Sequence, residues 1–310
     1  MKKYILKRLL IAVATLLVVL FILFLLMEFM PGTPFNNPEL SPEQKELLME
    51  KYGLNQPFFQ KFLTFLSNML RGDFGVSYNI QQNMPISQLL AKRFPVTLRI
   101  GFQAIVIGVV LGVVLGVVAG FHHNSLLDTL TSGVSMLGVS LPAFAFALGL
   151  SYFVGYKWGW LPFLYSNNQP FLSSLLPSFT LAVAPMASVA RYTRSEIVEV
   201  MQQDYITLAR VKGVSPKGLA VKHVLRNVFT GVITVVAPSV VNVLTGSLVV
   251  EKAFSVPGIG GLMITAIQEN DYNVTFALAF IYCALYIGIM LVVDVLYGVI
   301  DPRIRVAKGE

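Results

Sequence analysis

The residues that most often carry out chemistry are sparse in this chain, and none stands in a recognisable catalytic pattern. His122, His123 and His223 lack metal-site spacing, and motifs such as H-E-x-x-H and G-x-S-x-G are absent. The Gly-Lys dipeptide of phosphate-binding loops never occurs. We therefore expect no catalytic residue, no metal ligand and no bound cofactor, so another chain must supply any ATP-driven step.

Polar side chains within the long apolar stretches are equally few. Glu28 and Asp294 are the carboxylates there, whereas ion-coupled carriers gather carboxylates and histidines near the bilayer midplane. The apolar stretch 228–250 also carries three uncharged polar residues, Asn242, Thr245 and Ser247. These three are candidates for contact with a polar substrate, or for hydrogen bonds between helices.

Four glycines recur at a spacing of four residues: Gly108, Gly112, Gly116 and Gly120. On a helix this spacing places them on one face, where a second helix backbone can approach closely. The pattern predicts tight helix packing, and the partner helix could belong to this chain or to another. Prolines 142, 177, 185 and 238 lie in later apolar stretches, where they could bend helices or simply be tolerated.

The composition indicates the class of protein that must position these residues. The 310 residues are 55% hydrophobic and only 13% charged, about half the charge of a soluble domain. Several apolar runs reach the roughly 20 residues that cross a bilayer, too long for strands of a membrane barrel. A single cysteine, Cys283, excludes an internal disulfide framework. We expect a polytopic, all-α membrane protein.

The apolar runs predict six transmembrane helices, at 9–30, 96–120, 129–155, 171–190, 228–250 and 274–300. The segments 1–8, 121–128, 191–227 and 301–310 hold 14 Lys and Arg, against one each in 156–170 and 251–273. Because positive residues stay on the cytoplasmic side, both termini are expected in the cytoplasm.

The long segment 31–95 is expected outside the membrane as a small helical unit. Ser41-Pro42 reads as a helix start, a stripe from Phe59 to Leu70 has helical spacing, and a third short helix fits 85–94 before Pro95. It could contact a partner that delivers substrate, or pack on the outer ends of the helices. The predicted organisation is therefore 1–30, 31–95 and a five-span core, 96–310.

The cytoplasmic segment 191–227 is the most informative part of the sequence. A helix is predicted over 196–212 and ends at Gly213; a second begins at Ser215-Pro216 and reaches about residue 227. The first helix carries four apolar residues that we expect to be exposed: Ile206, Leu208, Ala209 and Val211. Such a helix could enter a groove on another protein or lie on the membrane surface.

This segment resembles the "EAA" loop of ABC-importer permeases. Ala209 and Gly213 match that pattern, while Thr207 and Leu208 replace its Glu and first Ala. The resemblance implies that these residues couple to an ATPase: Asp204, Tyr205, Ile206, Thr207, Leu208, Ala209, Arg210, Lys212 and Gly213. Further matching segments occur in order along the chain: Tyr52-Gly53-Leu54, Gly72-Asp73-Phe74-Gly75, Glu251, Val256-Pro257-Gly258, Asp271-Tyr272 and Asp301-Pro302-Arg303.

These segments, taken in their order along the chain, resemble those of the B-type permease subunit of dipeptide and oligopeptide ABC importers. That resemblance implies a type I importer in the bacterial cytoplasmic membrane. The partners would be a homologous second permease, two cytoplasmic ATPases that hold ATP and Mg, and an extracytoplasmic peptide-binding protein, with no nucleic acid. The chain itself would not be an enzyme. Nickel, glutathione or short saccharides remain alternative substrates, and a secondary transporter without ATPases is the rival class.

Overall fold

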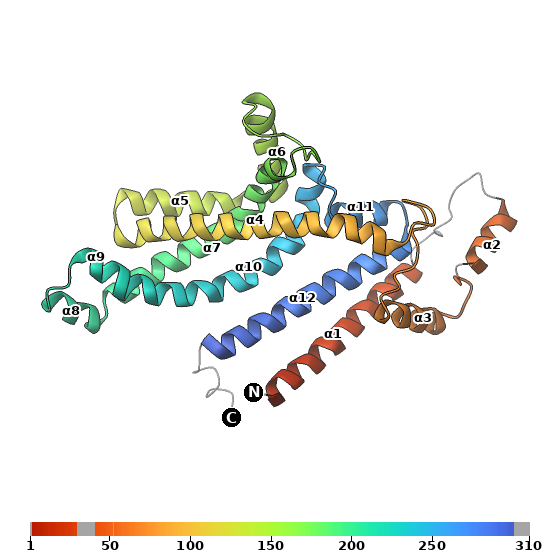
Figure 1. Ribbon diagram of the computed structural model, residues 1–310, viewed down its shortest axis with the longest axis horizontal. Coiled ribbons are helices and arrows are strands. Elements are labelled where there is room, and N and C mark those ends of the chain that lie inside the picture. Colours follow the sequence, from red (N-terminus) through yellow and green to blue (C-terminus); the bar gives the residue numbers. More distant parts are fainter. Residues whose placement is uncertain (1, 30–40, 52, 301–310) are drawn as a thin grey trace. The chain divides into compact units, whose positions relative to one another are not determined.

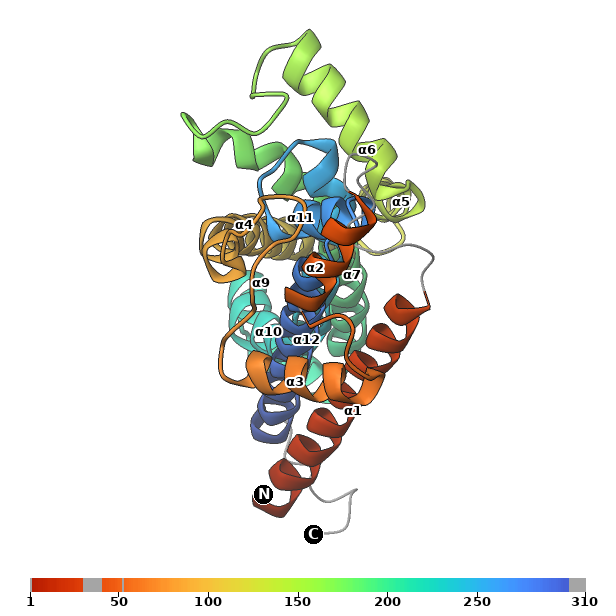
Figure 2. The same cartoon turned by 90° about the vertical axis from the view of Figure 1, so that its right-hand side faces the viewer.

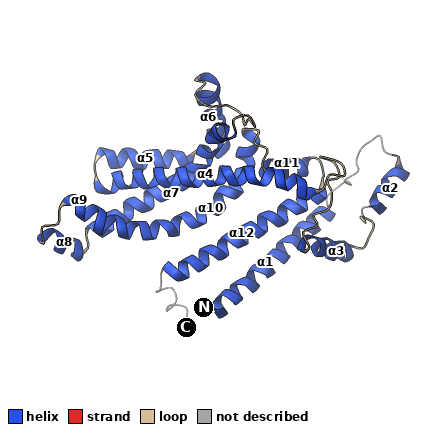
Figure 3. Ribbon diagram, in the orientation of Figure 1, coloured by secondary structure: helices blue, strands red, loops and turns tan. Residues whose placement is uncertain are grey.

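A computed structural model describes residues 2–29, 41–51 and 53–300. Helices supply the regular structure of these residues, which form no strand (Figure 3). The chain divides into two compact units, Met1–Val96 with Pro257–Leu291 and Thr97–Val256 with Val292–Glu310. The division predicted from the sequence, at residues 30 and 95, separates segments by the side of the membrane on which they lie. It is therefore a different kind of division from these contact-based units, and it stays a prediction.

One core of the first unit is a cluster of packed aromatic rings. It contains α1 (Lys2–Glu28), α2 (Pro42–Lys51), α3 (Phe58–Leu70), the start of α4 (Ile86–Phe121), α11 (Ile259–Gln268) and most of α12 (Tyr272–Ile300). Phe24 of α1 lies 5.4 Å from both Phe58 and Phe62 of α3 and 5.0 Å from Phe276 of α12, measured between ring centres. Edge-to-face and offset pairs of this kind favour a fixed crossing of α3 over α1 (Figure 2).

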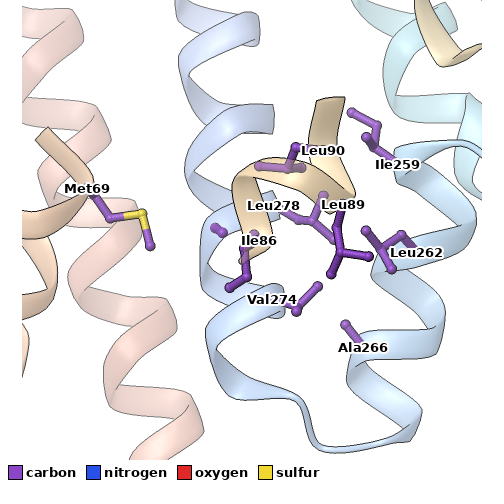
Figure 4. Close-up of a cluster of buried hydrophobic side chains, with 10 residues drawn as sticks. Met69, Ile86, Leu89, Leu90, Ile259, Leu262, Ala266, Val274 and Leu278 are labelled. Atoms are coloured by element: carbon purple, nitrogen blue, oxygen red, sulfur yellow. The ribbon is translucent and has the colours of Figure 1, made fainter. Parts of the chain in front are cut away.

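A second core of the first unit joins four segments of the chain (Figure 4). Its fully or nearly buried members include Met69, Ile86, Leu89, Leu90, Ile259, Leu262, Ala266, Val274 and Leu278. Burial of this apolar surface holds the start of α4 against α11 and α12, at about 25 cal/mol per Å² removed from water. Glu28, one of the carboxylates noted in the sequence, forms an ion pair with Lys61 of α3 at 2.6 Å.

A buried carboxyl group ties two distant sequence motifs together in this unit. Asp271 is fully buried, and its Oδ2 accepts hydrogen bonds from the Ser77 hydroxyl at 2.5 Å and from the backbone N–H groups of Asn79 and Ile80 at 3.0 and 3.2 Å. The Asn273 amide also donates to the Val76 carbonyl at 3.1 Å. The turn before α12 therefore fixes the loop that follows α3.

The second unit packs around one long helix. It contains the rest of α4, α5 (Leu126–Ser140), α6 (Ala143–Leu150), the π-helix η1 (Ser151–Lys157), α7 (Pro170–Met201), α8 (Asp204–Val211), α9 (Pro216–Gly218), the π-helix η2 (Leu219–Leu225) and α10 (Arg226–Ala253). Helix α7 is buried along most of its length and contacts both α5 and α10 (Figure 1).

Within the part of the chain that the structure describes, four segments are long and apolar enough to cross a membrane: Lys7–Leu26, Ile86–Phe121, Pro170–Met201 and Tyr272–Val293. The stretch 129–155, predicted as one span, is divided at Pro142, whose extended ψ of 132° and missing N–H separate α5 from α6. The predicted span 228–250 lies within α10. The count of six spans therefore stays a prediction.

The predicted end of the short helix at 85–94 is wrong. The helix expected to stop before Pro95 instead continues as α4 to Phe121, with Pro95 inside it. A proline within a helix removes one backbone hydrogen bond. Ile86, Leu89 and Leu90 before the proline and Ile100 after it are all buried, so packing on both sides offsets that loss.

Candidate functional site

The glycine face of α4 packs directly on α7. A methyl group added at Gly108, Gly112 or Gly116 would lie 2.8, 2.7 or 2.7 Å from a backbone carbonyl oxygen of α7, and one at Gly120 would lie 2.8 Å from Ile197 Cβ. No larger side chain fits at these distances, so the backbones of α4 and α7 lie close together along the glycine face. The sequence left open whether the partner helix belongs to this chain or to another, and in the structure it is α7 of this chain.

Two local signals in the sequence, a glycine helix end and a serine helix cap, shape the loop after α7. Helix α8 ends with Gly213 at a φ of +80°, a conformation that glycine adopts without strain. The Gly213 N–H donates to the Arg210 carbonyl at 3.0 Å, and the Val214 N–H donates to the Ala209 carbonyl at 3.2 Å. This pair of bonds is the Schellman helix end. Ser215 then caps the next helix, since its Oγ accepts from the Gly218 N–H.

The helix predicted over 196–212 is in fact two helices. Helix α7 ends at Met201, and Gln203 is extended, with a ψ of 146°, before α8 begins at Asp204. The second loop helix also continues past residue 227, directly into α10. The break turns α8 back toward α7, so that Ile206 can reach Ile197 and Val200 of α7.

Helix α8 has one face directed inward and one directed outward. Ile206 and Ala209 are buried in a core with Leu219 and Val224 of η2. The prediction that these two residues are exposed is therefore wrong, because the fold of the loop covers them. Tyr205, Leu208 and Val211 are 42%, 54% and 80% exposed.

The outward face of α8 combines these apolar side chains with polar and charged ones. Asp204, Thr207, Arg210 and Lys212 are all exposed beside Tyr205, Leu208 and Val211. The inward face meanwhile fixes α8 on α7, η2 and α10. The result is a short, rigidly mounted helix that presents an apolar patch with a charged border, which fits a groove on another protein. Gly213 sits at its end and sets the direction of the chain.

A charged cluster beside this loop was missed from the sequence. Asp128 near the start of α5 is buried and accepts from Arg194 Nε at 2.5 Å and Nη2 at 2.8 Å, and from the Asn124 N–H at 2.9 Å. His123 Nδ1 lies 3.4 Å from the same carboxylate. The Arg194 guanidinium holds the pKa of the Asp128 carboxyl well below its usual range, so it is ionised at neutral pH. The only sequence signal is local: Ser125 and Asp128 have the spacing of a helix start.

The structure describes only some of the polar residues that the sequence offers as candidates for contact with a substrate. The side chains of Asn242 and Thr245, and that of Asp294 in α12, lie outside the described residues. Ser247 is buried, and its hydroxyl donates to the Leu244 carbonyl of its own helix at 2.8 Å. Ser247 therefore offers no exposed polar atom to a substrate. Glu251 is also fully buried and accepts from the Thr97 hydroxyl at 2.7 Å.

The long apolar helices are those of a polytopic membrane protein, and α8 is a surface helix anchored in its core. Comparison with known families agrees with this class. Residues 112–306 match the family described as binding-protein-dependent transport system inner membrane component, and residues 1–101 match the N-terminal model of such membrane components. The chain belongs to this family. It is accordingly an integral membrane permease and not a catalytic subunit.

Relatives and solved structures agree with this assignment. The chain is 39% identical to the dipeptide transport system permease protein DppB of Lactococcus lactis, covering 98% of this chain and 100% of the relative. It is 36% identical to the oligopeptide permease OppB of Haemophilus influenzae (98% and 100% covered) and to the glutathione permease GsiC of Escherichia coli K12 (98% and 99%). The fold resembles that of the MetNI methionine ABC transporter, with a TM-score of 0.58 at 17% identity over 69% of this chain and 97% of that one.

Proposed function

We propose that this chain is a transmembrane permease subunit of an ATP-driven peptide importer in the bacterial cytoplasmic membrane. Full-length similarity to dipeptide and oligopeptide permeases supports the substrate class. The excess of Lys and Arg in alternate loops supports cytoplasmic termini and six spans. Its partners are a homologous second permease, two cytoplasmic ATPases that bind ATP and Mg, and an extracytoplasmic peptide-binding protein.

The outward face of α8 is the observation that carries this proposal. It presents Tyr205, Leu208 and Val211 at the surface, while Ile206 and Ala209 anchor the same helix in the core. A docking helix that must transmit force needs both properties. ATPase closure then moves α8, and α8 moves α7 and α10 with it.

The transport step follows from differential binding. The two permeases alternate between outward-open and inward-open states, and ATP shifts that equilibrium only through different affinities for the two states. Asn242 and Thr245 remain candidates for contact with the moving peptide. Selectivity lies mainly in the binding protein, because an importer of varied peptides cannot fit each side chain in its pathway.

The partners are tested by purification of the tagged chain from native membranes in mild detergent, followed by mass spectrometry. A second permease and ATPase subunits should accompany it. Recovery of the chain alone, together with failure of the ATPases from adjacent genes to bind it, would favour a secondary transporter.

Glutathione is the second candidate substrate, because the GsiC relatives are about as similar as OppB. Uptake of a labelled dipeptide by the reconstituted importer, with its binding protein, distinguishes the two. We expect unlabelled di- and oligopeptides to compete and glutathione to compete weakly. The reverse order would assign glutathione instead.

A further inference from the structure

The first turns of α5 depend on one buried residue. Across residues 122–130 Asp128 is the only buried side chain, while Leu126 and Leu127 point outward and are 82% and 46% exposed. The bidentate contact from Arg194 is therefore the main side-chain attachment of this end of α5 to α7. Bidentate arginine–carboxylate pairs fix orientation as well as distance.

Arg194 lies on α7, the helix that directly precedes α8 and packs against it. About one and two turns after Arg194, Ile197 and Val200 of α7 belong to the same buried cluster as Ile206 and Ala209 of α8. A continuous series of contacts thus leads from the outward face of α8 to α7, then through Arg194 to Asp128 and α5. Beyond Ser140, α5 is followed by the break at Pro142 and by α6.

We propose that the Asp128–Arg194 pair is a positioning device that makes α5 move together with α7 when the ATPases close. This inference rests on the proposed function of α8. Without the pair, α8 still docks and ATP is still hydrolysed, but the loop end of α5 no longer follows. The predicted consequence is uncoupling: less peptide is transported for each ATP consumed.

The test uses the complete importer with its binding protein, reconstituted in proteoliposomes. Peptide uptake and ATP hydrolysis are measured on the same preparation for Asp128→Asn, Arg194→Gln and Arg194→Lys. Arg194→Lys keeps the charge but loses the two-pronged geometry. Arg191→Gln is the matched control, because Arg191 is an exposed arginine one turn earlier on the same helix.

We expect Asp128→Asn and Arg194→Gln to lower the ratio of uptake to hydrolysis about fivefold or more, the low end of typical coupling effects. Arg194→Lys should be intermediate, and Arg191→Gln should match the wild type. The inference is overturned if the ratio is unchanged in the three variants, or if uptake and hydrolysis fall in proportion. If the stronger variants do not assemble, the ratio in Arg194→Lys decides. Failure of the proposed function is distinct, since the wild-type complex would then show no ATP-dependent peptide uptake.

Discussion

At the scale of single residues, the loop between α7 and α10 depends on Gly213. Its φ of +80° and its N–H bond to Arg210 close α8 and direct the chain to the Ser215 cap. An alanine there costs about 1 kcal/mol of backbone strain. A proline cannot adopt this φ at all and has no N–H to donate.

Gly213→Pro should therefore abolish peptide uptake while the chain still inserts in the membrane. The outward face of α8 would be misdirected, so ATPases should no longer purify with the variant. Lys217→Ala, at an exposed position four residues on, is the control and should retain both. Normal uptake by Gly213→Pro would refute the role of this turn.

Asp271 is a second residue whose removal has a local, measurable effect. Asp271→Ala leaves the Ser77 hydroxyl and the N–H groups of Asn79 and Ile80 without their acceptor, at a cost of about 1–3 kcal/mol for each group that stays buried. Hydrogen exchange of residues 76–82 should accelerate. Unchanged exchange there would show that the carboxyl group does not hold the loop, and exchange in α5 serves as the internal reference.

At the scale of elements, the contact of α4 with α7 is set by the absence of side chains. Gly116→Leu would place atoms where Thr193 Cβ and the Ala190 carbonyl already lie. We expect a loss of about 1–3 kcal/mol, the usual cost of overpacking, seen as a lower unfolding temperature in detergent. Gly133→Leu is the matched control, because nothing lies near Gly133. Equal stability of the two variants would contradict the packing.

The two faces of α8 should respond differently to substitution. Leu208→Glu introduces a charge into the exposed apolar patch, so ATPase binding should fall at least about tenfold, or 1.4 kcal/mol, with the fold intact. Val221→Glu, at a similarly exposed position on η2, should bind normally. Binding is measured as ATPase recovered per permease. Equal losses in both variants would remove α8 as the specific docking helix.

Much of this arrangement was predictable at the level of local rules. The glycine face of α4, the stop at Gly213 and the start at Ser215 all follow from residue type and spacing. The break before α8 was not predictable, because Gln202 and Gln203 carry no proline or glycine signal and glutamine favours helix. Packing of Ile206 onto α7 overrides that preference. The Asp128–Arg194 pair joins residues 66 positions apart, so no local pattern reveals it.

At the scale of the whole molecule, motifs that lie far apart in the sequence contact each other within each unit. In the first unit, Asp271 before α12 holds the loop that contains Ser77. In the second unit, Glu251 near the end of α10 accepts a hydrogen bond from the hydroxyl of Thr97, the first residue of that unit. Segments far apart in the chain are thus fixed by buried polar contacts. The exposed face of α8 is the surface that we propose contacts a partner.

The central claim is that this surface contacts the ATPase, and site-specific cross-linking tests it most directly. Cys283 is the only cysteine, so Leu208→Cys, Val211→Cys and Val134→Cys can each be made in a Cys283→Ser background and labelled with a benzophenone maleimide. Val134 is an exposed apolar residue of α5 and serves as the control. Illumination of the native-membrane complex should join positions 208 and 211, but not 134, to an ATPase subunit identified by mass spectrometry. Adducts from 208 and 211 only to lipid or to this chain itself would contradict the account.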